Sequence, residues 1–155
     1  MKTLKIGVCG VGNVGGAVLE NLANSPDIVE ENGGVRIEII QVGARKGKSV
    51  VPYELDVVTD LMEVARNPKV DVLVELIGGC DLAKDLIEEA IKNGKHIVLV
   101  PIAFVSEHSE TLVELDIEYK KLAMDNGCKQ YTRIPALGTN EDFIKSMSEL
   151  IIKKD

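Results

Sequence analysis

The chain has 155 residues, of which 45% are hydrophobic and only 3% aromatic. This length and apolar content suffice for one substantial core, so we expect a single domain spanning residues 1–155. A formal charge of −7 argues against general binding to nucleic acid or anionic membranes. No apolar run is long enough to span a membrane and the first residues lead directly into a strand, so we expect a cytoplasmic protein.

Apolar runs rich in β-branched residues alternate with segments of helical period, which is typical of repeated β-α-β units. The sequence predicts an α/β fold of the Rossmann type, a doubly wound, mainly parallel sheet of about six strands. Helices cover both faces, in three layers. Strands are expected at 4–9, 35–42, 70–77, 97–100 and 129–134. Helices are expected at 14–24, 55–66, 81–93, 106–126 and 140–152, and a polar segment, 27–34, links the first helix to the second strand.

The first expected strand and helix are joined by a glycine-rich turn. Gly10, Gly12 and Gly15 have the G-x-G-x-x-G spacing of dinucleotide-binding turns. In that motif the first glycine allows the tight turn, the second lets the backbone approach a pyrophosphate, and the third lets the helix pack closely on the strand. Free N–H groups at the helix start hold the phosphates. A dinucleotide cofactor is therefore the expected partner.

The end of the second strand predicts which dinucleotide is preferred. NAD-binding domains normally carry an Asp or Glu there to bind the ribose hydroxyls, but this chain has Ala44, Arg45 and Lys46, followed by Lys48. Cations suit a 2′-phosphate better than a free diol, so NADP is expected over NAD. The alternative is an ordinary solvated basic loop.

The residues expected to contact the cofactor come from four loops, beginning at Gly10, Gly43, Gly78 and Val100, that should converge at the carboxyl ends of the strands. They are Gly10, Gly12, Asn13, Val14, Gly15, Ala44, Arg45, Lys46, Ile77, Gly78, Gly79, Val100 and Pro101.

Other candidate residues carry weaker signals. The three cysteines, Cys9, Cys80 and Cys128, lack the paired spacing of zinc sites and are expected to be reduced, and no metal site is predicted. His96 and His108 are expected to be structural or solvated. Glu75 interrupts an apolar strand, so it should lie at the strand's end near the cofactor loop or find a hydrogen-bonding partner. No residue is singled out as catalytic.

Three segments carry a resemblance to a known family. They are GVGNVGGAVLENL near the start, VDVLVELIGGCDLAKDLIEEAIKNGKHIV at 70–98 with the motif VELIGG at 74–79, and SEHSETL at 106–112. These segments resemble the homoserine dehydrogenase family, and the resemblance covers roughly residues 4 to 125. The resemblance implies hydride exchange between NAD or NADP and homoserine or aspartate semialdehyde. It also implies that most of the catalytic part lies in a second domain, before which this chain ends.

One departure from the family bears on activity. Where the family reads GKHVVTANKALLA, this chain has GKHIVLVPIAFVS, so Pro101 and Ile102 stand in place of the Asn and the Lys implicated in catalysis. Charge and donor are both lost, and turnover by this chain alone is expected to fail. After Gln130 the sequence predicts a strand, a helix and a stop. Two alternatives stay open, a nucleotide-binding regulatory or sensor domain, and a scaffold without ligand; so does association with a second copy or another domain.

Overall fold

The computed structural model describes residues 2–45, 55–79 and 81–152. It divides into two compact units, Met1–His96 (unit 1) and Ile97–Asp155 (unit 2), and each is described by itself. That the two form one domain stays a prediction.

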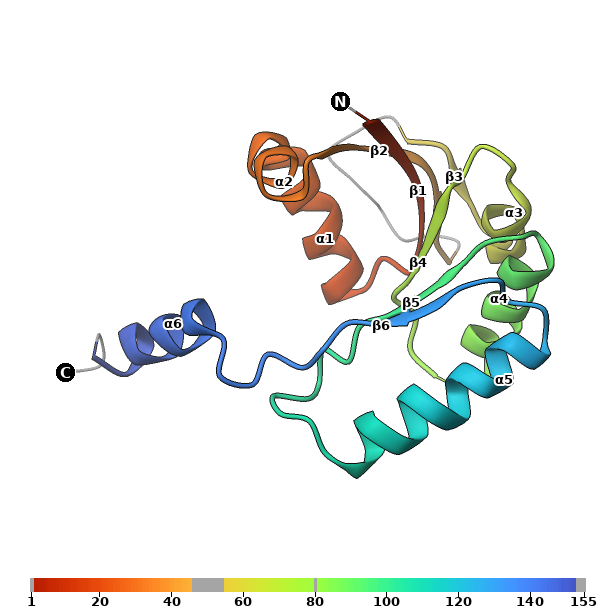
Figure 1. Cartoon of the computed structure of the whole chain (residues 1–155). Helices are drawn as coiled ribbons and strands as arrows, with labels where there is room; N and C mark the ends of the chain where they lie inside the picture. Colours follow the sequence, from red (N-terminus) through yellow and green to blue (C-terminus); the bar gives the residue numbers. More distant parts are fainter. Residues whose placement is uncertain (1, 46–54, 80, 153–155) are drawn as a thin grey trace. The chain divides into compact units, whose positions relative to one another are not determined.

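Unit 1 is built on a parallel sheet with strand order β3-β2-β1-β4 (Figure 1). Its strands are β1 (Lys2–Cys9), β2 (Val35–Gly43), β3 (Val57–Val58) and β4 (Val72–Glu75). β1 pairs in parallel with β2 on one side and with β4 on the other. The chain therefore adds strands outward from β1 and then returns to its other side, which places a switch point between β1 and β4.

Helices cover both faces of this sheet, as the amphipathic pattern predicts. Alternate residues of β1 point to opposite faces. Ile6 and Val8 pack with Leu19 of α1 (Asn13–Asn24), whereas Cys9 packs with α3 (Leu61–Arg66) and α4 (Asp81–Lys92). Unit 1 thus has the three layers expected from the sequence.

Two local expectations in unit 1 are wrong. The polar segment 27–34 contains a helix, α2 (Pro26–Gly33), because Pro26 suits the first helical turn and Gly34 closes the helix at a φ of 65°. The helix expected at 55–66 begins only at Leu61, and residues 57–58 form β3 instead. Asp60 sets that start, since its Oδ1 accepts a hydrogen bond from the Met62 amide at 3.0 Å.

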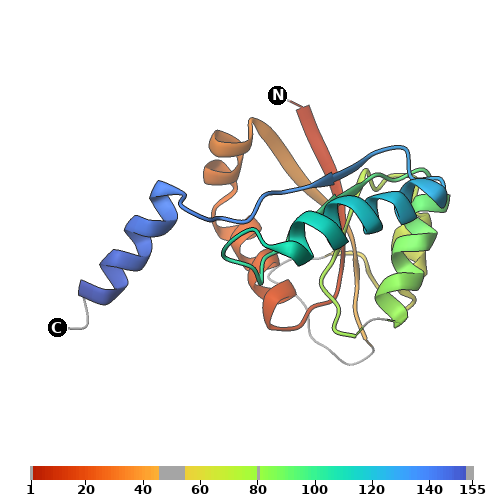
Figure 2. The ribbon, with the colours of Figure 1, turned by 60° about the horizontal axis from the view of Figure 1, so that its bottom comes forward.

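Unit 2 holds a second, smaller parallel sheet, formed by β5 (Ile97–Leu99) and β6 (Tyr131–Arg133). Between these strands lie η1 (Glu110–Tyr119), whose hydrogen bonds follow the wider π-helical pattern, and α5 (Lys120–Asp125). The segment expected as one α-helix at 106–126 is therefore π-helical over ten residues. The last helix, α6 (Glu141–Ile152), is confirmed, but none of its residues is buried; both views show it apart from α5 (Figures 1 and 2).

Arg133 fixes η1 against β6. Its side chain is only 7% exposed and donates to both carboxylate oxygens of Asp116, at 2.7 and 2.6 Å, and to Glu107 at 2.9 Å. Tyr131 adds a hydrogen bond from its hydroxyl to the carbonyl of Leu115 at 2.7 Å. The guanidinium lowers the pKa of Glu107 from its ordinary value of 4.5 to about 2, aided by hydrogen bonds from Thr111 and the Ala136 amide.

The α/β class and the mainly parallel pairing are confirmed. The expectation of one sheet of about six strands is not, because the six strands of the described residues form one sheet of four and one of two. β5 and β6 are only three residues long and pair with each other.

Candidate nucleotide site

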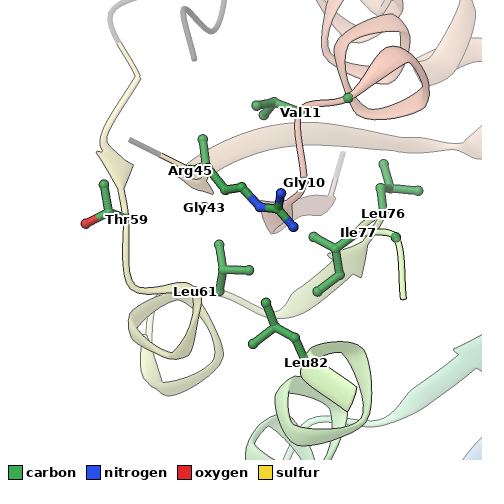
Figure 3. A pocket seen from close by; sticks show the side chains of 12 residues that line it. Gly10, Val11, Gly43, Arg45, Thr59, Leu61, Leu76, Ile77 and Leu82 are labelled. Atoms are coloured by element: carbon green, nitrogen blue, oxygen red, sulfur yellow. The ribbon is translucent and has the colours of Figure 1, made fainter. Parts of the chain in front are cut away.

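A cavity of about 380 Å³ opens at the carboxyl ends of the strands of unit 1 (Figure 3). It lies at the switch point between β1 and β4, where open α/β sheets bind ligands. Its walls come from the turn after β1, the ends of β2 and β3, the loop after β4, and the starts of α3 and α4. The lining residues are Gly10, Val11, Gly12, Gly43, Ala44, Arg45, Thr59, Leu61, Leu76, Ile77, Gly78 and Leu82.

The three glycines of the turn meet three different surroundings. Gly10 has a φ of 99°, and a β-carbon there would lie 2.5 Å from the carbonyl oxygen of Leu76. A β-carbon at Gly15 would overlap the carbonyl oxygen of Gly10. At Gly12 a β-carbon would meet nothing within 4 Å. Gly10 and Gly15 are therefore required by the fold, whereas the space at Gly12 opens into the cavity.

Among the described residues, no side chain caps the backbone donors at the start of α1. Gly12, the residue before the helix, has extended backbone and no side chain to cap it, and the first turn holds no acidic residue. The first intrahelical bond runs from the Gly16 amide to the Gly12 carbonyl at 2.8 Å. The amides before Gly16 have no carbonyl within the helix to reach, so this end of α1 favours an anion.

Arg45 places a cation in the cavity. It follows Ala44, whose amide is held by the Val58 carbonyl at 2.9 Å, so the chain leaving β2 keeps a fixed path. Figure 3 shows the Arg45 side chain extending toward Gly10, with Thr59 at the other side of the cavity. The site thus combines a guanidinium with the open backbone at Gly12, a pairing that suits a phosphorylated ligand.

Apolar side chains form the other wall. They are Leu61 of α3, Ile77 of the loop after β4 and Leu82 of α4, and they face one another in the cavity (Figure 3). A flat apolar group such as a nucleobase fits such a wall, since ligand sites are mostly apolar with a few placed polar groups.

Six of the residues predicted from sequence line this cavity. They are Gly10, Gly12, Ala44, Arg45, Ile77 and Gly78. Asn13, Val14 and Gly15 begin α1 directly beside it, and Gly79 ends the loop after β4 at a φ of 94°. Lys46 and Lys48 lie outside the described residues, and Val100 and Pro101 belong to unit 2. Their contact with a cofactor stays a prediction.

Sequence reasoning missed half of the lining. Thr59, Leu61 and Leu82 come from segments that carry no motif, and Val11 and Leu76 are neighbours of motif residues that were not named. Gly43 was expected only as the start of a converging loop, not as a contact. Only Gly43 had a usable signal, because it is the glycine at the end of the second strand.

The remaining candidates keep to structural roles. Cys9 and Cys128 are buried free thiols, and Cys80 lies outside the described residues. His108 stacks edge-on against Phe104, with ring centroids 4.6 Å apart. Among the described residues, no group of three or more His, Cys, Asp or Glu side chains could hold a metal ion. None of the described helices has the length and hydropathy needed to cross a bilayer.

Strand order, glycine turn and cavity together define unit 1 as a Rossmann-type α/β fold. Homoserine dehydrogenase of Pseudomonas aeruginosa is 38% identical to this chain over 113 residues, which is 72% of this chain and 26% of that protein. The crystal structure of a homoserine dehydrogenase from Thiobacillus denitrificans matches with a TM-score of 0.62 and 28% identity, covering 85% of this chain and 30% of that one. The resemblance to the N-terminal domain of homoserine dehydrogenases is confirmed.

A second similarity covers the other end of the chain. Residues 82–155 match the family model for ferrochelatase. Ferrochelatase of Pelagibacter ubique is 79% identical over 72 residues, which is 46% of this chain and 21% of that protein. The two similarities together exceed the chain's length, so they share residues. This chain spans about a quarter of the length of the dehydrogenase and a fifth of the chelatase.

The ferrochelatase match changes the interpretation of the C-terminal motifs. SEHSETL at 106–112, assigned above to the dehydrogenase resemblance, lies within it, as does the departure from GKHVVTANKALLA. Pro101 and Ile102 therefore stand in a segment that also resembles a different family. Sequence reasoning missed this second similarity.

Proposed function

We propose that unit 1 binds a nicotinamide dinucleotide at the glycine turn and is the cofactor-binding part of an oxidoreductase of the homoserine dehydrogenase type. One observation carries this proposal. Gly12 is open to the cavity while Gly10 and Gly15 are sterically required on either side of it, at the uncapped start of a helix. That division of roles is the one a pyrophosphate site demands.

The preferred cofactor is NADP. Arg45 lines the cavity directly after β2, and no carboxylate stands at the end of that strand to bind a free ribose diol. A guanidinium can hold a 2′-phosphate by two hydrogen bonds, and its advantage is lost when that phosphate is absent.

In the proposed complex the described residues bind and orient rather than react. Amides at the start of α1 hold the pyrophosphate, Arg45 holds the 2′-phosphate, and Leu61, Ile77 and Leu82 exclude water from the base. When bound, the nicotinamide ring supplies or accepts a hydride. We propose further that this chain alone does not turn over homoserine, because Pro101 and Ile102 replace the Asn and Lys of the family's motif.

Titration of the whole chain with NADPH and with NADH, followed by cofactor fluorescence, tests these proposals. We expect saturable binding of both, with NADPH at least tenfold tighter, and no oxidation when aspartate semialdehyde is added. Tighter NADH binding would reject the NADP assignment. Turnover would reject the argument from Pro101 and Ile102, and failure to bind either cofactor would reject the dinucleotide site. Binding without turnover leaves room for a regulatory or sensor role.

A second candidate function rests on the ferrochelatase match of residues 82–155. It is that unit 2 belongs to an iron chelatase, as the name of those relatives denotes. Its support is sequence identity, whereas the dinucleotide proposal also has a cavity of fitting geometry. Incubation of the chain with ferrous iron and a porphyrin tests it, since metalloporphyrin formation above the uncatalysed rate would favour this candidate.

The cytoplasmic location stays a prediction.

A further inference from the structure

Glu75 ends β4 at the edge of the candidate site without lining the cavity. It is paired in register with Cys9 of β1, and its neighbour two residues earlier, Leu73, packs on the core between the sheet and α3 and α4. Residues two apart in a strand share a face, so Glu75 belongs to that same side of the sheet. A carboxylate in this half-buried position needs a hydrogen-bond partner.

That partner is the loop that walls the cavity. The Oε1 atom of Glu75 accepts a hydrogen bond from the Ile77 amide at 2.6 Å. The preceding amide, that of Leu76, donates to the Cys9 carbonyl at 2.8 Å. Two successive amides of the loop are thereby fixed, one by β1 and one by the Glu75 side chain.

The fixed loop sets the shape of the cavity. Leu76, Ile77 and Gly78 all line it, and the Leu76 carbonyl lies so close to Gly10 that a β-carbon there would be 2.5 Å away. A shift of the loop toward β1 is therefore blocked by the turn, and a shift away from β1 must break the bond from the Leu76 amide to the Cys9 carbonyl. The Glu75 bond holds the next amide, that of Ile77, whose side chain forms part of the apolar wall.

Glu75 lies beside Cys9 on the side of the sheet that α3 and α4 cover. Cys9, its partner in register, is fully buried, and its thiol has a pKa raised to about 12 by burial and by the nearby carboxylate. The thiol therefore stays neutral at physiological pH. The loop amide is the polar group that satisfies this carboxylate.

We propose that Glu75 is a positioning residue of the dinucleotide site, which holds the loop after β4 in its binding shape through the Ile77 amide. This inference rests on the proposed function. The positioning role requires a hydrogen-bond acceptor at Glu75 rather than a charge, because the Ile77 amide donates to a single oxygen. A glutamine, whose side-chain carbonyl can accept the same bond, should therefore replace Glu75 with little loss.

The test compares Glu75→Ala with Glu75→Gln in the full chain, measuring NADPH affinity and the thermal midpoint of each. We expect Glu75→Ala to weaken NADPH binding roughly tenfold, as loss of one hydrogen bond implies, and Glu75→Gln to stay within about threefold of wild type. Leu86→Ala is the control, since Leu86 is fully buried in the same core and outside the cavity lining. It should lower the midpoint but leave NADPH affinity unchanged.

Each result bears on a different claim. If wild type binds NADPH and Glu75→Ala binds it equally well, the positioning role is wrong while the proposed function stands. The positioning role is also wrong if Glu75→Gln weakens binding as much as Glu75→Ala, or if Leu86→Ala weakens it as much. If wild type itself fails to bind, both the proposed function and this inference are overturned.

Discussion

Gly15 packs its α-carbon against the carbonyl oxygen of Gly10, so closely that the first atom of any side chain at Gly15 would overlap that oxygen. This contact joins the first turn of α1 to the end of β1. The open position between these two residues, Gly12, is therefore flanked by two glycines that the fold requires.

Gly15→Ala tests this contact. The added methyl group must push α1 from β1, so we expect a loss of about 1–3 kcal/mol in the free energy of unfolding, measured in urea. Gly16→Ala is a matched control, because Gly16 lies in the same helix and its β-carbon would meet nothing within 4 Å. It should raise stability by about 0.5–1 kcal/mol, since alanine favours a helix interior. Equal effects at the two positions would contradict the close contact.

Gly12→Ala separates fold from binding. Its β-carbon meets no protein atom within 4 Å, so the thermal midpoint should stay within a degree or two of wild type. The same methyl group projects where the pyrophosphate is proposed to lie, and we expect NADPH affinity to fall at least tenfold. Unchanged NADPH affinity would mean that the ligand does not approach this backbone.

Arg45→Ala tests the choice of cofactor. We expect about a tenfold loss of NADPH affinity and less than a twofold change for NADH, because the guanidinium is proposed to hold the 2′-phosphate, which NADH lacks. Paired titrations of the two cofactors give the ratio directly. A parallel loss for both would show that Arg45 contacts the shared part of the dinucleotide instead.

The ion pairs of Arg133 with Glu107 and Asp116 predict that the stability of unit 2 depends on pH. Because the folded state lowers the pKa of Glu107 to about 2, its stabilisation is fully present above the ordinary value of 4.5. It is lost as the pH falls from there toward 2. Glu107→Gln should reduce stability at neutral pH and make the loss of stability between pH 4.5 and 2 smaller. Unfolding followed by circular dichroism at several pH values measures both effects. Glu118→Gln, which removes an exposed carboxyl on η1, should leave this acid-induced loss of stability unchanged. If Glu107→Gln also leaves it unchanged, the role given to Glu107 is contradicted.

The sequence predicted unit 1 well because its signals are local. The strand, turn and helix around Gly10 to Gly15 depend on residues adjacent in the chain, and the structure places them as expected. The helix start at Leu61 was missed because it depends on capping by Asp60, while the apolar pattern continues upstream through Leu55 and Val58.

The cavity wall was harder to predict because it is assembled across elements. Leu61 and Leu82 look like ordinary core residues in sequence, and only strand order brings them opposite Ile77. In unit 2 the π-helix could not be foreseen from periodicity, since its anchors, Arg133 and Tyr131, lie on a strand well after it.

The most direct test of the dinucleotide site is amide chemical-shift mapping of the whole chain by NMR as NADPH is added. We predict that the largest changes fall on the amides of Gly12, Asn13 and Val14, with further changes at Arg45 and Gly78. Changes confined to residues of unit 2, or an unchanged glycine turn at saturating NADPH, would contradict it.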